Sequence, residues 1–128
     1  MAAENVIITK TARKKMVQAR AGYKALPKIV GMVFGKGGID SSGNVIAPSE
    51  SQTDLKSELY RKPISGYSFT SDTTCRYECT LSETELAGAE ISEVGLYDAD
   101  GDIACIKNFS KKGKDADLEM TFTLDDVF

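Results

Sequence analysis

Residues 90–109 constrain the fold of this chain more than any other segment, because they read as two β-strands joined by a tight turn. Their sequence is EISEVGLYDADGDIACIKNF. Asp100-Gly101 is a strong two-residue hairpin signal, since both central residues of such a turn take positive φ. With this turn Leu96 pairs with Cys105, whereas a longer turn would shift the register.

Both faces of this hairpin carry apolar side chains. In the register set by the two-residue turn, Gly95 pairs with Ile106. One face then presents Val94, Leu96, Ile103 and Cys105, and the other presents Gly95, Tyr97, Ala104 and Ile106. A sheet with two apolar faces needs cover on both sides. One helix cannot cover both, so we expect a second sheet layer or another subunit to help.

The length of the chain bounds how many domains it can form. Its 128 residues are near the commonest domain size, and we expect residues 1–128 to form a single domain. No apolar run approaches the roughly 18 residues of a membrane span. The first residues lack the apolar core of a signal peptide, so we expect synthesis in the cytoplasm and no membrane partner.

One amphipathic helix is expected over residues 9–22. Thr9 or Thr11 can cap its start, and Gly22 can end it. Its apolar stripe follows a spacing of four, three and four residues. The stripe consists of Ala12, Met16, Ala19 and Tyr23.

Most of the remaining chain reads as strands. Period-two alternation or apolar runs predict strands over residues 28–34, 65–72, 74–81 and 118–124, besides the hairpin. Residues 54–64 are expected to hold a short helical turn before Pro63. Residues 35–54 are expected to form a long Gly/Ser-rich loop, which in a compact domain is usually functional or mobile. The predicted fold class is α+β, with one N-terminal helix packed on a mainly antiparallel β-sheet or small β-sandwich.

Candidate chemistry in the sequence is sparse. There is no histidine, and the cysteines, Cys75, Cys79 and Cys105, read as core residues. The acidic run at 98–102 lacks the Gly and Glu positions of a calcium loop. GKGG at 35–38 offers amides to an anion but lacks the spacing of a P-loop, so a flexible turn is expected. We therefore expect no catalytic residue, no metal and no cofactor, and not an enzyme.

Charge is distributed unevenly along the chain. Up to Lys36 there are eight basic residues and one acid, Glu4, a net charge of +7, while the rest carries eight basic and eighteen acidic residues, a net charge of −10. The basic part reads as a solvated helix face or as a surface that docks on the acidic part. It lacks the interleaved aromatics of a single-strand binder, so no nucleic-acid partner is expected. Complementary fields could also align subunits head to tail.

Taken together, these motifs resemble the N-terminal domain of phage tail-collar fibre proteins. EISEVGLYDADGDIACI is similar to that family's signature, a Glu-hydrophobic-Gly-Leu-Tyr-Asp core followed by an acidic-Gly turn and an apolar strand. ITKTARKKMVQA resembles the family's opening helix, and GMVFGKGG resembles its strand with a glycine-rich turn. SQTDLKSELYRKPI is similar to its Thr-x-Leu-x-x-Glu-hydrophobic-Tyr-Arg segment. The matches keep the family's order over nearly the whole chain.

The resemblance implies a structural component of a phage or prophage tail, located in the virion tail, with no cofactor or catalytic residue. Longer relatives continue into a shaft and a receptor-binding tip where this sequence ends, at Phe128. A small baseplate or fibre-attachment subunit is therefore expected. Its partners would be other phage tail or baseplate proteins and copies of itself, as a trimer by analogy with fibres.

Partner contacts are expected on three regions: the loop 35–54, the basic face of the helix and residues 58–61. The candidate residues are Arg13, Lys14, Arg20, Lys36, Glu58, Tyr60 and Arg61. For Arg61, an internal salt bridge to Glu58 or Glu93 is an equal alternative. A small-ligand or carbohydrate-binding β module is the alternative function, with Tyr23, Tyr60 and Tyr67 as the aromatic residues to watch.

Overall fold

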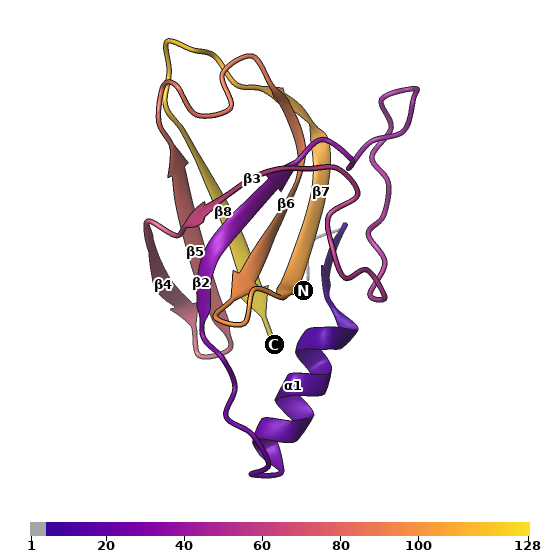
Figure 1. The fold of residues 1–128 in the computed structure, drawn as a ribbon, viewed down its shortest axis with the longest axis vertical. Helices are drawn as coiled ribbons and strands as arrows, with labels where there is room; N and C mark the ends of the chain where they lie inside the picture. Colours follow the sequence, from indigo (N-terminus) through magenta and orange to yellow (C-terminus); the bar gives the residue numbers. More distant parts are fainter. Residues whose placement is uncertain (1–4) are drawn as a thin grey trace.

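The computed structural model describes residues 5–128 as two antiparallel β-sheets packed face to face, with one helix at one end (Figure 1). The larger sheet has the strand order β1-β7-β6-β2-β3, and the smaller has the order β4-β5-β8. The elements are β1 (Val6–Ile8), α1 (Lys10–Arg20), β2 (Ile29–Gly35), β3 (Glu58–Pro63), β4 (Gly66–Ser71), β5 (Thr74–Leu81), β6 (Glu90–Asp98), β7 (Ile103–Gly113) and β8 (Met120–Val127). Glu4, the acid of the basic N-terminal part, lies outside the described residues.

The predicted fold class, α+β with a packed helix, is wrong. Helix α1 has 11 residues, and Ala12 is its buried residue. Met16 and Ala19 are half-buried and Tyr23 is 78% exposed, so the apolar stripe does not form a layer on a sheet. The helix extends beyond the end of the sandwich (Figure 1). Within residues 5–128, no helix has the length and apolar character needed to cross a lipid bilayer.

Residues 58–63 also differ from the prediction, because they form the edge strand β3 and not a helical turn. Strand β3 pairs antiparallel with β2, with Arg61 opposite Val33 and Pro63 opposite Gly31. Proline is tolerated at the edge of a sheet, where its missing N–H breaks no ladder. The pairing with β2 is a long-range contact that local propensity does not register.

The main core lies between the two sheets. Met32, Phe34, Val94 and Leu96 of the larger sheet pack against Cys79, Leu81, Phe122 and Leu124 of the smaller one. The Phe34 and Phe122 rings meet edge to face with centroids 5.2 Å apart. Cys79 and Cys105 are buried in this core, and Cys75 is half-buried. Burial raises the pKa of Cys79 to about 11, so its thiol stays protonated at neutral pH.

The β6–β7 hairpin has the predicted pairing of Leu96 with Cys105, but a different turn. The Asp98 amide donates to Asp102 O and the Gly101 amide to Asp98 O, so three residues lie between 98 and 102. In this turn only Gly101 has positive φ. A bulge at Ala104 then restores the expected register. The bulge places Ile103 opposite Tyr97 and moves it off the face shared by Val94, Leu96 and Cys105, where we expected it.

The outer face of the larger sheet is covered by a segment of the chain itself, residues 36–57, which we call the covering segment. Leu55 is buried there against Val33, Ile103 and Ile106. The second sheet thus covers one apolar face of the hairpin and the covering segment covers the other. Another subunit is not needed for this role.

A single carboxylate holds both ends of the covering segment. Glu93 is fully buried on β6. Its Oε2 accepts hydrogen bonds from the amides of Gly37 at 2.7 Å and Ser57 at 2.8 Å, and its Oε1 accepts one from Lys56 at 2.9 Å. These three donors compensate the charge for the loss of water. In place of an external anion, the glycine-rich turn binds the chain's own Glu93.

The glycines of this turn are explained by close approach. The Gly38 amide donates to Ser92 Oγ at 3.0 Å. A Cβ at Gly38 would lie 1.9 Å from the carbonyl oxygen of Ser92, and a Cβ at Gly37 would lie 2.7 Å from Glu93 Oε2. Only glycine lets the backbone pass this close to β6.

Replacing Glu93 with Gln should release the covering segment. The amide NH₂ cannot accept the hydrogen bonds that the carboxylate accepts, so we expect a loss of about 2–4 kcal/mol in the free energy of unfolding. Hydrogen exchange should accelerate at the amides of Gly37, Lys56 and Ser57. The matched control is Glu90→Gln on the same strand, whose exposed pair with Lys111 should contribute less than about 0.5 kcal/mol. Equal stability of the two variants would contradict this role.

Candidate interaction surface

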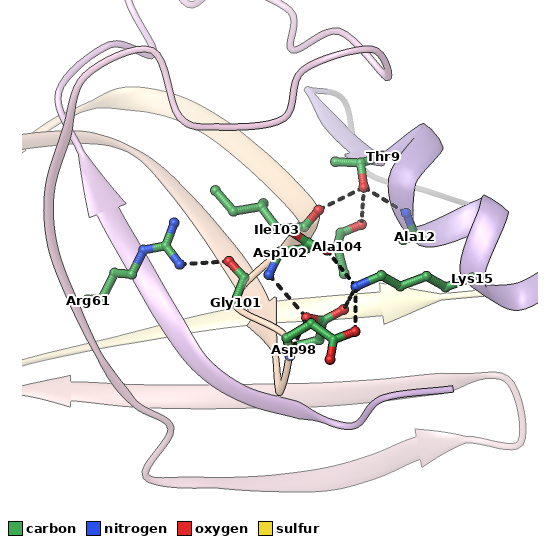
Figure 2. A network of polar contacts seen from close by, with 10 residues as sticks. Thr9, Ala12, Lys15, Arg61, Asp98, Gly101, Asp102, Ile103 and Ala104 are labelled. Carbon is green, nitrogen blue, oxygen red and sulfur yellow. Dashed lines mark hydrogen bonds and ion pairs between the residues drawn. The ribbon is translucent and has the colours of Figure 1, made fainter. Parts of the chain in front are cut away.

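Helix α1 is fixed to the β6–β7 hairpin by polar contacts at its first turn (Figure 2). Of the two predicted caps, Thr9 is the one that fills the position: its Oγ1 accepts from the Ala12 amide at 3.1 Å. The same hydroxyl donates to Ile103 O at 2.8 Å, and the Thr9 amide donates to Ala104 O at 3.0 Å. The bulge at Ala104 therefore provides the attachment point for the helix.

The second attachment is made by Lys15 (Figure 2). Its Nζ donates to Asp98 at 2.7 Å, Asp100 at 3.1 Å and Asp102 at 2.8 Å. These carboxylate oxygens lie within 4.8 Å of one another, close enough to share one cation. Burial alone would lower the pKa of Lys15, but its hydrogen bonds to Asp102, Asp98 and Asp100 outweigh burial and hold that pKa above the usual value. The ammonium group of Lys15 thus offsets one of the three negative charges of the acidic turn and binds this turn to α1.

Arg61 lies in an internal network. Its guanidinium donates two hydrogen bonds to Glu58, at 2.9 and 3.1 Å, and one to Gly101 O at 2.9 Å. It also lies 5.1 Å from the centroid of the Tyr97 ring, at cation–π distance. Of the two internal partners considered from the sequence, Glu58 is the one that Arg61 binds in the structure, whereas Glu93 holds the covering segment.

Tyr60 is also bonded within the chain. Its hydroxyl donates to Glu85 Oε2 at 2.5 Å, and Lys62 Nζ binds the other carboxylate oxygen at 2.7 Å. The hydrogen bond from Lys62 is the largest of the contacts that lower the pKa of Glu85 to about 2. Strand β3 is therefore tied to the loop after β5.

Three of the four basic candidates lie on α1, and the fourth, Lys36, follows β2. Arg13 on α1 pairs with Glu50 of the covering segment at 2.5 Å. Lys14 and Arg20, also on α1, and Lys36 after β2 are exposed, and within residues 5–128 their side chains have no ion-pair partner. The structure does not gather the seven predicted contact residues into one patch. Their contacts with a partner stay a prediction.

A groove that the sequence did not predict lies between α1 and the smaller sheet. Its volume is about 610 Å³. Three of its aromatic residues are strongly exposed: Tyr67 at 62%, Phe69 at 76% and Phe128 at 62%. The Tyr67 and Phe69 rings meet edge to face, 5.8 Å between centroids. The apolar lining consists mainly of Met16, Leu26, Ile29, Tyr67, Phe69, Tyr77 and Phe128.

Asp126 brings a carboxylate into this apolar groove. It follows Phe122 and Leu124 in the alternation of β8, so it occupies a position on the face turned toward the core. It is 9% exposed and, within residues 5–128, has no hydrogen-bond or ion-pair partner. Burial raises the pKa of Asp126 to about 6. The predicted strand ended at Leu124; extending its alternation by one period would have identified this residue.

Comparison with known proteins finds one protein family whose model matches the chain. The family model described as phage tail-collar fibre protein, N-terminal, matches residues 1–123 of the chain. This match confirms the resemblance inferred from the sequence motifs. No curated protein and no solved structure matches the chain.

Replacing Lys15 with Met should weaken the attachment of α1. Three carboxylates, one of them the buried Asp98, would lose their shared cation, and we expect a loss of about 1–3 kcal/mol in the free energy of unfolding. Chemical denaturation measures this loss. Lys14→Met, the exposed neighbour, should change stability by less than about 0.5 kcal/mol. A Lys15 variant as stable as the Lys14 variant would show that the triad does not anchor the helix.

Replacing Asp126 with Asn should stabilise the isolated chain at pH 7. The folded-state pKa lies above the usual 3.8, so ionisation opposes folding. The shift corresponds to at most about 3 kcal/mol, and we expect a gain of about 1–2 kcal/mol because the amide also lacks a partner. The difference between variant and wild type should be smallest below pH 3.8 and grow until about pH 6. Urea unfolding at several pH values measures it; a difference that does not change with pH would contradict this interpretation.

Proposed function

The chain belongs to the phage tail-collar fibre protein N-terminal family, and we propose that it serves as a small baseplate or fibre-attachment subunit that acts through protein–protein contacts. It is thus a phage tail protein with a structural role in the virion tail. We further propose that residues 1–128 work as one domain, that its partners are other tail or baseplate proteins, and that it forms homo-oligomers. A trimer is the form suggested by analogy with fibres.

The observation that carries this proposal is the exposed aromatic groove beside α1. Tyr67, Phe69 and Phe128 are each more than 60% exposed and line one surface. Contiguous exposed apolar surface marks sites of protein–protein contact, and aromatic side chains are enriched at the centre of such contacts. A subunit built into a larger particle would bury this surface on assembly.

The clustered charged side chains form ion pairs within the fold, which also supports a structural role. Among residues 5–128, the acidic turn binds Lys15, Arg61 binds Glu58, and Glu85 binds Lys62. Each of these pairs joins one element of the fold to another or stiffens a strand. They stabilise the shape that a docking surface requires.

A carbohydrate-binding module is the second candidate, and the exposed ring of Tyr67 is the observation in its favour. Sugar binding commonly uses an exposed aromatic face with polar groups beside it. In this groove aromatic residues and an unpaired acid line one surface, which is mainly apolar. This composition suits a protein partner better.

The test is to locate the protein in tail particles. We expect an epitope-tagged chain to copurify with tails at a fixed ratio to other tail proteins and to be labelled by immunogold at the baseplate or fibre base. Deletion of its gene should give particles that lack fibres or a complete baseplate. Complete, infectious particles without the protein would contradict the proposal, and a specific hit on a glycan array would then favour the carbohydrate-binding alternative.

A further inference from the structure

We propose that the groove between α1 and the smaller sheet receives the end of α1 from a second copy of this chain, so that copies join head to tail. The donating surface, which we call the helix tip, consists of Val17, Arg20, Tyr23 and Lys24. The proposal rests on the proposed function, because it names the contact through which the subunit assembles with itself.

The groove contains a carboxylate, Asp126, to which no cation of the described residues is bound. Asp126 is nine-tenths buried beside apolar side chains, its carboxylate has no hydrogen-bond or ion-pair partner within residues 5–128, and its oxygens reach the open groove. A carboxylate in such a place costs free energy unless it is paired or hydrogen-bonded. A basic side chain inserted from outside would pair with Asp126, and the surrounding rings of Tyr67 and Tyr77 would also favour a cation.

The helix tip supplies both kinds of group that the groove needs. Val17 is 69% exposed and Tyr23 is 78% exposed, so the tip offers apolar surface. Arg20 and Lys24 are exposed beside them and have no ion-pair partner within residues 5–128. In its own molecule, no tip residue lines the groove. Tyr23 and Lys24 line a separate, shallow cleft beside Asp100 and Asp102, and Val17, Arg20, Tyr23 and Lys24 stay exposed to a neighbouring copy.

The charge of the two parts is complementary over a longer range. The N-terminal part up to Lys36, which includes the helix tip, carries a net charge of +7, and the remainder carries −10. The groove itself is lined by three acids, Asp72, Asp98 and Asp126, and two bases, Lys15 and Lys28, a net charge of −1, and Lys15 is already bound by three aspartates. Opposite fields of this kind orient two copies before contact and favour one register.

The sheet edge beside the groove also supports a contact between copies at this site. Strand β4, an edge strand of the smaller sheet, carries no charged residue and no proline, and its Tyr67 and Phe69 are exposed. The edge strand β3 of the larger sheet, in contrast, carries Glu58, Arg61, Lys62 and Pro63. Soluble proteins usually protect their edge strands in the second way. An unprotected edge indicates that β4 is covered in the assembled state.

The contact joins two different surfaces, so it is heterologous. Such contacts produce a closed ring when the rotation between copies closes. In a ring of three copies, every groove would be filled by the helix tip of a neighbouring copy. The contact assigns a specific pair of surfaces to the proposed trimer, and the number of three copies comes from the analogy with fibres.

The deciding experiment is photo-crosslinking of the full chain. A benzoylphenylalanine placed at position 69 is activated in a mixture of ¹⁵N-labelled and unlabelled protein, both free at high concentration and in purified tails. We expect crosslinked peptides of mixed isotope content that join position 69 to residues 17–24 of another copy. The same probe at Leu118, which is also exposed but does not line the groove, should give no such product.

Substitutions test the chemistry of the contact. Asp126→Asn should weaken self-association about tenfold in analytical ultracentrifugation, and the double variant Arg20→Ala/Lys24→Ala should do the same. Asp125→Asn and Lys14→Ala are the matched controls and should leave association unchanged, because Asp125 binds Arg76 and Lys14 lies outside the tip. The Asn variant at 126 should weaken association while the monomer becomes more stable, which a purely structural role would not produce.

Two results would overturn the inference. One is crosslinks from position 69 that stay within one copy or map to another tail protein; the other is self-association that is unaffected by both substitutions. If the protein is present in tails but crosslinks elsewhere, the head-to-tail contact fails while the proposed function stands. If the protein is absent from tails, the proposed function fails, and the crosslinks of the free chain still decide the contact.

Discussion

The buried carboxylate of Glu93 is the interaction on which the architecture depends. It binds amides at both ends of the covering segment, and thereby lays Leu55 over the outer face of the larger sheet. Without this cover, Val33, Ile103 and Ile106 would face water. One charge, compensated by three backbone donors, thus allows a short chain to enclose a sheet on both faces.

The family signature EVGLYD can be understood from this arrangement. Gly95 is required because a Cβ there would lie 2.9 Å from the carbonyl oxygen of Cys105. Tyr97 crosses β2 where Gly31 leaves room, since a Cβ at Gly31 would lie 2.1 Å from Tyr97 Cζ. Asp98 accepts the amides of Asp100 and Asp102 and closes the turn. The signature residues hold the fold together.

Local patterns in the sequence predicted the parts of the fold that local physics determines. The alternation of β5, the inward positions of Met120, Phe122 and Leu124 on β8, and the pairing of Leu96 with Cys105 were predicted correctly. Leu118, expected to face inward at the start of the last strand, precedes β8 and is 63% exposed. The fold class, the strand β3 and the face of Ile103 were wrong, because they depend on pairing with β2 and on a bulge at Ala104. The role of Glu93 could not be predicted, since its amide donors lie 36 to 56 residues away. Asp126 was missed only because the predicted strand was too short.

The attachment of α1 has a consequence for how the molecule can vary. The first turns of the helix are fixed by Thr9 and Lys15 to one hairpin turn and by Lys10 and Arg13 to Glu50 of the covering segment, and the rest of the helix projects from the sandwich. Its direction therefore depends on the shape of a few turn residues and on the contact with the covering segment. An insertion or deletion in the turn of the β6–β7 hairpin would change the angle at which helix α1 projects, while the sandwich stayed intact.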